Sequence, residues 1–125
     1  MSKPAATKYD VVTATDQHRV QGALVPVPFN GVIVGDVAST VLIEKVPAAR
    51  IKSKAQNSPA HVPPPGKAFD NPPTNEGRIT MSLGKNVLVE NWPLARDGDP
   101  VKTCDDTDGT TGVVVAAGSV LVGDG

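Results

Sequence analysis

Internal repetition constrains the fold of this chain more than any other feature of its sequence. Segment 31–50, GVIVGDVASTVLIEKVPAAR, aligns without a gap with segment 77–96, GRITMSLGKNVLVENWPLAR, and eight of the twenty positions are identical. Segment 112–125, GVVVAAGSVLVGDG, repeats the first part of that unit with one residue deleted. Internal repeats of this kind indicate copies of one small structural unit packed against each other. The sequence therefore predicts three copies of one unit within a single fold.

Each unit is predicted to be a β-hairpin. In the first copy, β-branched runs at Val32–Val34 and Thr40–Ile43 flank Gly35-Asp36, a composition typical of turns. The same pattern gives two further predicted hairpins: Arg78–Leu83 with Asn86–Glu90 around Gly84-Lys85, and Val113–Val115 with Val120–Val122 around Gly118-Ser119. We therefore expect an all-β fold of three β-hairpins with approximate threefold symmetry (about 31–50, 77–96 and 112–125).

Composition limits how large the core can be. The chain has 125 residues, 12 Gly, 12 Pro and four aromatic side chains, which favours one turn-rich domain with a thin aliphatic core. Segment 54–76 carries six prolines and is expected to run as an extended wrap, because proline breaks helices and cannot donate within a central strand. We predict a single domain over residues 15–125, preceded by an N-terminal segment 1–14. A metal ion or a partner chain is expected to supplement so thin a core.

Charge and targeting signals exclude several classes of function. The net charge is −1 with both signs interspersed, so no basic surface for nucleic acid is expected. The N-terminal residues lack the apolar stretch of a secretory signal, so any export is expected to use another vehicle. The longest apolar run is too short to span a bilayer. A single cysteine excludes a disulfide within the chain.

Three residues could bind a metal ion together. His18, His61 and Cys104 are the only histidines and the only cysteine, and each is separated from the next by forty-three residues. Each lies in the irregular stretch before one repeat, so units arranged around an axis would bring them together. Imidazole and thiolate are ligands that zinc prefers. Accidental scatter of three residues is the alternative explanation of this spacing.

Acidic residues lie close to two of these candidates. Asp16 precedes His18, and three more carboxylates follow Cys104 at Asp105, Asp106 and Asp108. Asp16 or Asp106 could act as a supplementary ligand or orient a histidine, whereas the same residues are also frequent turn formers. Cys104 with His61 and an aspartate would also suit a cysteine hydrolase, but no nucleophile motif surrounds the cysteine.

Several motifs, in order, resemble those of PAAR-type proteins. Pro47-Ala48-Ala49-Arg50 is the motif that gives this family its name, and Pro93-Leu94-Ala95-Arg96 is a degenerate second copy. Further motifs similar to those of PAAR-like tips cover roughly residues 15 to 125: Asp16-Gln17-His18, Val25-Pro26-Val27-Pro28-Phe29-Asn30-Gly31, Asn57-Ser58-Pro59-Ala60-His61-Val62-Pro63, Asn71-Pro72-Pro73-Thr74-Asn75-Glu76-Gly77 and Thr103-Cys104-Asp105-Asp106.

The resemblance implies a fold, a metal site and a partner. It implies a small cone of β-hairpins that binds as one copy to a trimeric, VgrG-like spike protein. It further implies one metal ion, zinc or alternatively iron, bound by His18, His61 and Cys104. The chain departs from the family where Val27 replaces a histidine, so the implied fourth ligand is absent.

The function implied by the resemblance is mechanical rather than enzymatic. The tip would cap the spike of a contractile injection system (a type VI secretion system, a phage tail or an extracellular particle) and help it to pierce a membrane. Because the chain ends directly after the third repeat, we expect a tip without an appended effector domain. A cargo or effector adaptor on the same scaffold and a small metal-dependent hydrolase are the alternatives.

Overall fold

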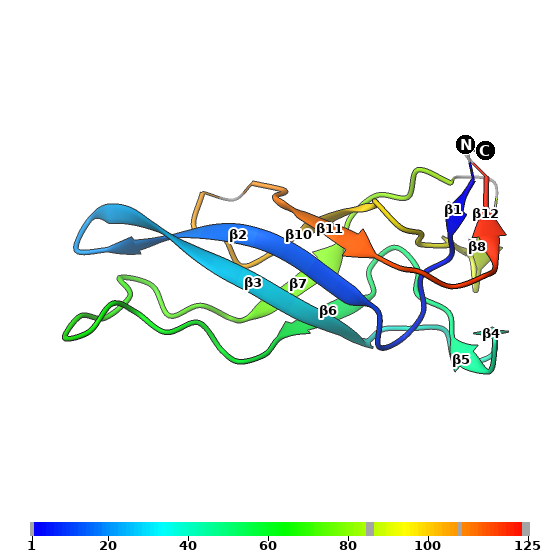
Figure 1. Ribbon diagram of the computed structural model, residues 1–125, viewed down its shortest axis with the longest axis horizontal. Coiled ribbons are helices and arrows are strands. Elements are labelled where there is room, and N and C mark those ends of the chain that lie inside the picture. The colour runs from blue at the N-terminus through cyan, green and yellow to red at the C-terminus, as the bar shows by residue number, and fades with distance from the viewer. Residues whose placement is uncertain (1, 85–86, 108, 124–125) are drawn as a thin grey trace.

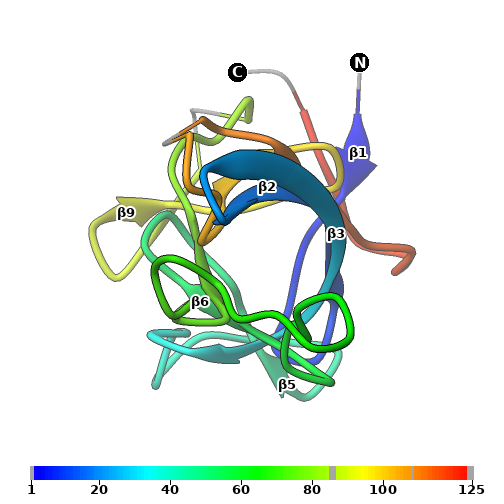
Figure 2. The ribbon, with the colours of Figure 1, turned by 90° about the vertical axis from the view of Figure 1, so that its left-hand side faces the viewer.

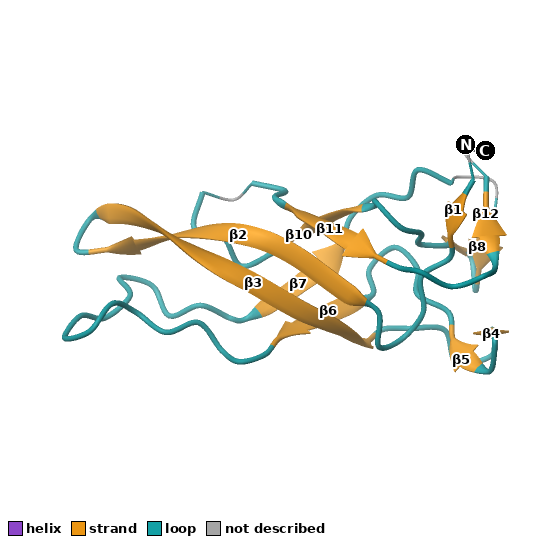
Figure 3. Cartoon of the chain, viewed as in Figure 1, coloured by secondary structure: helices purple, strands orange, loops and turns teal. Residues whose placement is uncertain are grey.

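The computed structural model describes residues 2–84, 87–107 and 109–123 and contains no helix among them. The fold is all-β, as predicted from the sequence, and Figure 3 shows strands and loops only. The molecule is elongated, with a barrel in its middle and three short sheets near the two ends of the chain (Figure 1). Within the described part of the chain, no helix has the length and apolar character needed to cross a membrane.

Six antiparallel strands form a closed barrel. In spatial order they are β10 (Pro100–Lys102), β11 (Gly112–Val115), β2 (Val11–Val20), β3 (Ala23–Gly35), β6 (Lys54–Asn57) and β7 (Glu76–Ile79). Pairing of β7 with β10 closes the ring, which Figure 2 shows end-on. Closure leaves no unpaired edge strand in the barrel.

Strands β2 and β3 continue beyond the barrel as a long hairpin, which extends to the left in Figure 1. Gln21 and Gly22 form its turn with φ angles of 52° and 82°, as a type I′ turn requires. The Asp70 carboxylate accepts the N–H groups of Gln21 and Gly22 at 2.8 and 2.9 Å. The proline-rich connector is therefore attached to the end of the hairpin.

Three two-stranded sheets lie at the opposite end, and we call them the base sheets. They pair β4 (Leu42–Ile43) with β5 (Val46–Pro47), β8 (Leu88–Val89) with β9 (Trp92–Pro93), and β1 (Lys3–Pro4) with β12 (Leu121–Val122). The first two are tight hairpins whose turn residues, Glu44-Lys45 and Glu90-Asn91, all have positive φ. The third base sheet is assembled from the two ends of the chain.

The predicted strand pairings are wrong, although at least part of each predicted run does form a strand. Val32–Val34 was expected to pair with Thr40–Ile43, but Val32 pairs with Val11 and Gln56 in the barrel. Likewise β7 and β11 pair with barrel strands rather than with β8 and β12. The reason is burial: Ile33, Ile79 and Val114 alternate inward and fill the barrel, which requires long-range partners. Lys85, Asn86, Asp124 and Gly125 belong to the predicted repeats but lie outside the described residues.

A cyclic set of hydrogen bonds joins the three units where the barrel meets the base sheets. The N–H of Ala6 donates to the carbonyl of Ala95 at 2.9 Å, that of Ala49 to Ala6 at 2.9 Å, and that of Ala95 to Ala49 at 3.0 Å. We call these three residues the axial ring, and all three are fully buried. Each donates to the next around a closed circle, so the units are related by an approximate threefold axis.

The axial ring reveals a third copy of the Pro-Ala-Ala motif that the sequence analysis missed. Pro4-Ala5-Ala6 occupies the place that Pro47-Ala48-Ala49 occupies in the first unit. In each copy, the residue that follows the motif donates its backbone N–H to a side chain three residues further along the chain. These pairs are Thr7 and Asp10, Arg50 and Ser53, and Arg96 and Asp99. Segment 1–14 therefore supplies β1, an axial-ring residue and the start of β2, and the predicted boundary between residues 14 and 15 lies inside that strand.

Phe29 fills the barrel where the first glycines of the repeats come together. A Cβ atom added to Gly31 would lie 2.6 Å from Phe29 Cε1, and one added to Gly77 would lie 3.4 Å from Cζ of the same ring. At the equivalent Gly112 an added Cβ would lie 3.1 Å from the carbonyl oxygen of Val101. The identical glycines of the repeats thus leave room for one aromatic ring and for close backbone packing.

Candidate metal centre

Four potential metal ligands meet beside the part of β2 that leads toward the β2–β3 turn. Asp16 and His18 lie on β2, at positions whose burial alternates with exposed neighbours. His61 belongs to the proline-rich connector, and Cys104 follows β10. Their ligand atoms all lie within 4.8 Å of one another. We call these four residues the metal cluster.

The Asp16 carboxylate is the centre of the cluster. Its Oδ2 atom lies 2.9 Å from His61 Nε2, 3.4 Å from Cys104 Sγ and 3.8 Å from His18 Nε2. The Cys104 sulfur lies 3.8 Å from His18 Nε2. Asp16 Oδ1 accepts a hydrogen bond from the hydroxyl of Thr103, so the carboxylate is held by both oxygens. Asp16 and His18 are fully buried, and the His61 side chain is nearly so.

Aromatic rings hold the two imidazoles in place. The His18 and His61 rings meet edge to face with centroids 4.9 Å apart. Phe69 of the connector lies against His18 at 5.3 Å, and Phe29 lies against His61 at 6.0 Å. The same phenyl ring that fills the barrel therefore also supports one side of the cluster.

Asn57 determines which nitrogen of His61 carries the proton in the metal-free cluster. Asn57 Oδ1 accepts the N–H of Asn30 at 2.9 Å, so its Nδ2 group is the one that faces His61 Nδ1 at 3.2 Å. The same Nδ2 donates to Asn75 Oδ1, which also accepts the N–H of His61. Nδ1 of His61 is thus an acceptor, and the neutral ring carries its proton on Nε2, where it donates to Asp16.

The far side of His18 is less well satisfied. Its Nδ1 atom lies 3.3 Å from Asp106 Oδ1, but the two atoms are not aligned for a hydrogen bond. Nδ1 has no hydrogen-bond partner among the described residues. Asp106 Oδ2 instead accepts the N–H of Arg19 at 2.7 Å. Asp106 is therefore placed to attract and orient the imidazole from outside the cluster rather than to join the four converging atoms.

The environment of Cys104 disfavours a thiolate unless a cation is present. Burial, followed by the negative charge of Asp16, raises the pKa of Cys104 to about 11. Its thiol lies 3.4 Å from Asp16 Oδ2, to which it donates its proton. A thiol with so high a pKa is a poor nucleophile at neutral pH, which argues against the cysteine-hydrolase alternative. Two acidic groups and two imidazoles buried together form a donor set that suits a divalent metal ion.

The other acidic candidates have different places. Asp105 accepts the N–H of Gln17 and the hydroxyl of Thr107, which agrees with the turn-forming interpretation. Burial acts to raise the pKa of Asp105, but these hydrogen bonds lower it overall. Asp108 lies outside the described residues. Val27, where the resemblance implies a histidine, is the cross-strand partner of Asp16 in the β2–β3 register.

Two residues that support the cluster were not identified from the sequence. Asn57 fixes the His61 tautomer, and Thr103 holds Asp16. Each belongs to a motif already noted for other reasons, since Asn57 begins the segment that ends in His61-Val62-Pro63 and Thr103 precedes Cys104. Their polar side chains next to candidate ligands were the available signal.

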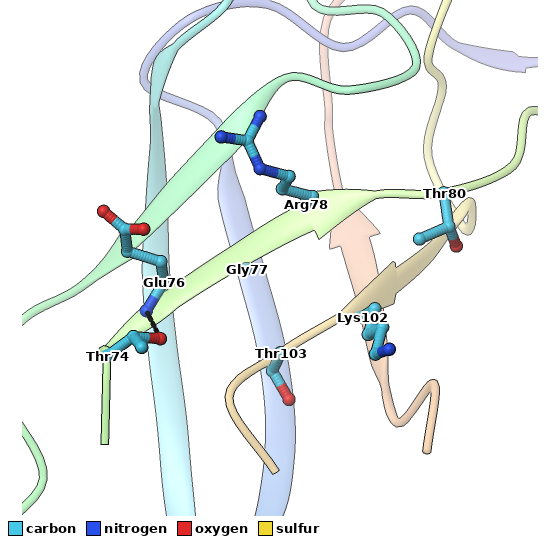
Figure 4. A pocket seen from close by; sticks show the side chains of 7 residues that line it. All are labelled: Thr74, Glu76, Gly77, Arg78, Thr80, Lys102 and Thr103. Carbon is cyan, nitrogen blue, oxygen red and sulfur yellow. Dashed lines mark hydrogen bonds between the residues drawn. The ribbon is translucent and has the colours of Figure 1, made fainter. Parts of the chain in front are cut away.

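A surface pocket lies beside the cluster rather than over it. Figure 4 shows this pocket of about 290 Å³, which is lined by Thr74, Glu76, Gly77, Arg78, Thr80, Lys102 and Thr103. It lies over β7 and β10, and Thr103 is the lining residue that contacts Asp16. The four potential ligands themselves are not part of its lining.

Comparison of the chain with protein-family models and with curated proteins finds no match. Its function is therefore inferred from its own motifs, symmetry and site geometry.

Proposed function

We propose that this chain is the metal-stabilised, PAAR-type tip of a contractile injection system. In this role one copy caps a trimeric, VgrG-like spike protein and helps the spike to pierce a target membrane. The chain would act mechanically and catalyse no reaction. Assembly in the cytoplasm and delivery with the particle belong to the same proposal.

The observation that carries the proposal is the axial ring. A single chain can cap a threefold partner without a symmetry mismatch only if it presents three equivalent surfaces itself. The cyclic hydrogen bonds of Ala6, Ala49 and Ala95 give this monomer such an approximate axis. Ala49 belongs to the PAAR-like motif Pro47-Ala48-Ala49-Arg50.

The base sheets supply a surface that suits such a partner. Leu42, Leu88 and Leu121 begin equivalent strands of the three sheets and are 58%, 62% and 60% exposed. Three exposed leucines in equivalent positions form an apolar ring that a partner of the same symmetry could cover. The short edges of the base sheets also offer backbone groups for strand addition.

A metal ion would make the opposite end rigid. Ligands from β2, the proline-rich connector and the segment after β10 come together in the cluster, so one ion would clamp three separate parts of the chain. Zinc suits His18, His61 and Cys104 best, with iron as the alternative. Metal binding that requires the folded arrangement adds its binding energy to the stability of the fold.

Reconstitution tests the proposal. The chain is mixed with a VgrG-like trimer encoded in the same genome, and the complex is weighed by native mass spectrometry. We expect three spike chains for each tip. Leu88→Asp should abolish the complex and leave the circular dichroism spectrum unchanged, whereas Val62→Asp, at an exposed position in the connector, should not affect binding. A three-to-three complex, or none with the native chain, would refute the proposal.

A further inference from the structure

We infer that Asp16 is the fourth metal ligand of this chain and takes the place that Val27 leaves empty. The site would then consist of Asp16 Oδ2, His18 Nε2, His61 Nε2 and Cys104 Sγ. The inference rests on the metal site proposed above, and it deepens that proposal by specifying its donor set.

The distances within the cluster suit four-coordinate binding. Zinc holds nitrogen and oxygen ligands at about 2.0–2.1 Å and sulfur at about 2.3 Å, so the donors of a tetrahedral site are separated by roughly 3.3–3.6 Å. Asp16 Oδ2 lies 3.4 Å from Cys104 Sγ and 3.8 Å from His18 Nε2. Cys104 Sγ and His18 Nε2 are 3.8 Å apart. The shorter 2.9 Å separation from His61 Nε2 is a hydrogen-bond distance, which an inserted ion would lengthen.

Register explains why a carboxylate can substitute for the missing histidine. Asp16 and Val27 are directly paired across β2 and β3, and paired residues on antiparallel strands project from the same face. A histidine at position 27 would therefore approach the site from the neighbouring strand at the same level as Asp16. With valine there, the Asp16 carboxylate has one oxygen within 3.8 Å of each of the three other donor atoms.

Charge balance favours the same assignment. A divalent ion bound by two neutral imidazoles and one thiolate keeps one net positive charge, which in a buried site needs a negative group close by. Asp16 Oδ2 lies within 3.8 Å of all three other donors and is placed to supply that charge. Ligation by Asp16 brings the net charge of the ion and its ligands to zero. The carboxylate is also oriented in advance, since its other oxygen accepts the Thr103 hydroxyl.

Metal binding would replace two hydrogen bonds at one oxygen. In the metal-free cluster, Asp16 Oδ2 accepts the Nε2–H of His61 and the S–H of Cys104. On binding, the Cys104 proton is released to solvent, and the His61 proton moves to Nδ1. In the metal-free cluster Asn57 presents its amino group to Nδ1, so it would have to turn its oxygen toward His61. That turn would break two hydrogen bonds, the one from the N–H of Asn30 and the one that Asn57 donates to Asn75.

The decisive experiment compares metal binding in four chains loaded with Co²⁺ or Zn²⁺. Asp16→Asn keeps the size of the side chain and an oxygen for Thr103, and it should weaken Zn²⁺ binding by more than about 100-fold, beyond the effect of losing an outer partner. Adding Val27→His to Asp16→Asn should restore most of the affinity. Asp106→Asn, the matched control, should weaken binding by about 10-fold and leave the visible Co²⁺ spectrum unchanged.

A measurement on the native chain guards against variants that fail to fold. With Asp16 as fourth ligand, no exchangeable water is bound to Co²⁺, so the loaded protein should barely enhance the relaxation of water protons. Strong enhancement, or unchanged affinity and Co²⁺ spectrum in Asp16→Asn, would overturn the inference while leaving a three-ligand site intact. A native chain that binds neither ion would overturn both the inference and the proposed metal site.

Discussion

The close approach of Gly31 to Phe29 gives a prediction in which one substitution changes its effect when a second is present. Gly31→Ala would place a Cβ atom 2.6 Å from Phe29 Cε1 and 3.2 Å from Ala55 Cβ. Because Phe29 is fully buried, its ring has no free space to move into. We expect Gly31→Ala to lower the free energy of unfolding by about 1–3 kcal/mol, the usual cost of overpacking.

Shortening the ring should remove that cost. Phe29→Leu alone should lower the free energy of unfolding by about 1–2 kcal/mol, because it leaves a partly filled cavity. In the Phe29→Leu chain, Gly31→Ala should cost close to nothing. Gly31 does not have positive φ, so alanine at this position causes no backbone strain in the folded state. Alanine also lowers the conformational entropy of the unfolded chain, and this stabilisation of about 0.4–1 kcal/mol offsets the remaining contact with Ala55. The coupling free energy between the two positions should be at least about 1 kcal/mol.

Urea unfolding followed by circular dichroism measures all four corners of this cycle. Gly109→Ala is the control, because an added Cβ meets only Thr107 Oγ1 at 3.6 Å and Thr111 Cγ2 at 3.7 Å. Its free energy of unfolding should stay within about 0.5 kcal/mol of the native value. Additive effects of the Gly31 and Phe29 substitutions would refute the packing described for the barrel.

Three further predictions concern charged groups. The hydroxyl of Thr40 is the main cause that lowers the pKa of Glu90 from 4.5 to about 2. The stabilising effect of Glu90 is therefore complete above pH 4.5 and is lost as the pH falls toward 2. The difference in melting temperature between Glu90→Gln and the native chain should shrink over that range, and a constant difference would contradict this. The pKa of Cys104 is raised to about 11 in the metal-free protein, so metal uptake near neutral pH must release its proton; competition titrations between pH 6 and 8 should show affinity rising by at least about 10-fold per pH unit, and a flat profile would exclude the thiolate as a ligand. Asp70→Ala should speed hydrogen exchange of the two N–H groups in the β2–β3 turn that its carboxylate accepts, by roughly 5-fold or more, while barrel amides stay unchanged; equal protection in both chains would mean that the connector does not hold the hairpin.

The sequence predicted the elements of the fold better than their partners. Runs of β-branched residues correctly identified strands at Val32–Val34 and Val113–Val115. The sequence could not predict that these strands pair across the barrel, because pairing depends on which distant strand covers the same buried face. The true hairpin turns, Glu44-Lys45 and Glu90-Asn91, have positive φ without glycine, so turn composition pointed instead to Gly35-Asp36.

For the cluster, the regular spacing of His18, His61 and Cys104 indicated that the three residues converge, and in the structure they lie together. The sequence left Asp16 and Asp106 equivalent as supplementary candidates. Tertiary structure separated them, because Asp16 points inward from β2 whereas Asp106 lies beyond the far nitrogen of His18.

By itself, then, the sequence determined the all-β class, the repeat and the convergence of His18, His61 and Cys104, because these depend on residue type and spacing along the chain. Only the tertiary structure decided how the third unit is completed. Pro4-Ala5-Ala6 and β12 are at opposite ends of the sequence, yet β1 pairs with β12 and Ala6 closes the axial ring. A repeat divided between the two ends of a chain has no continuous pattern to detect. Backbone hydrogen bonds and burial around the axis hold its two halves together, because a buried backbone N–H without a hydrogen-bond partner is energetically costly.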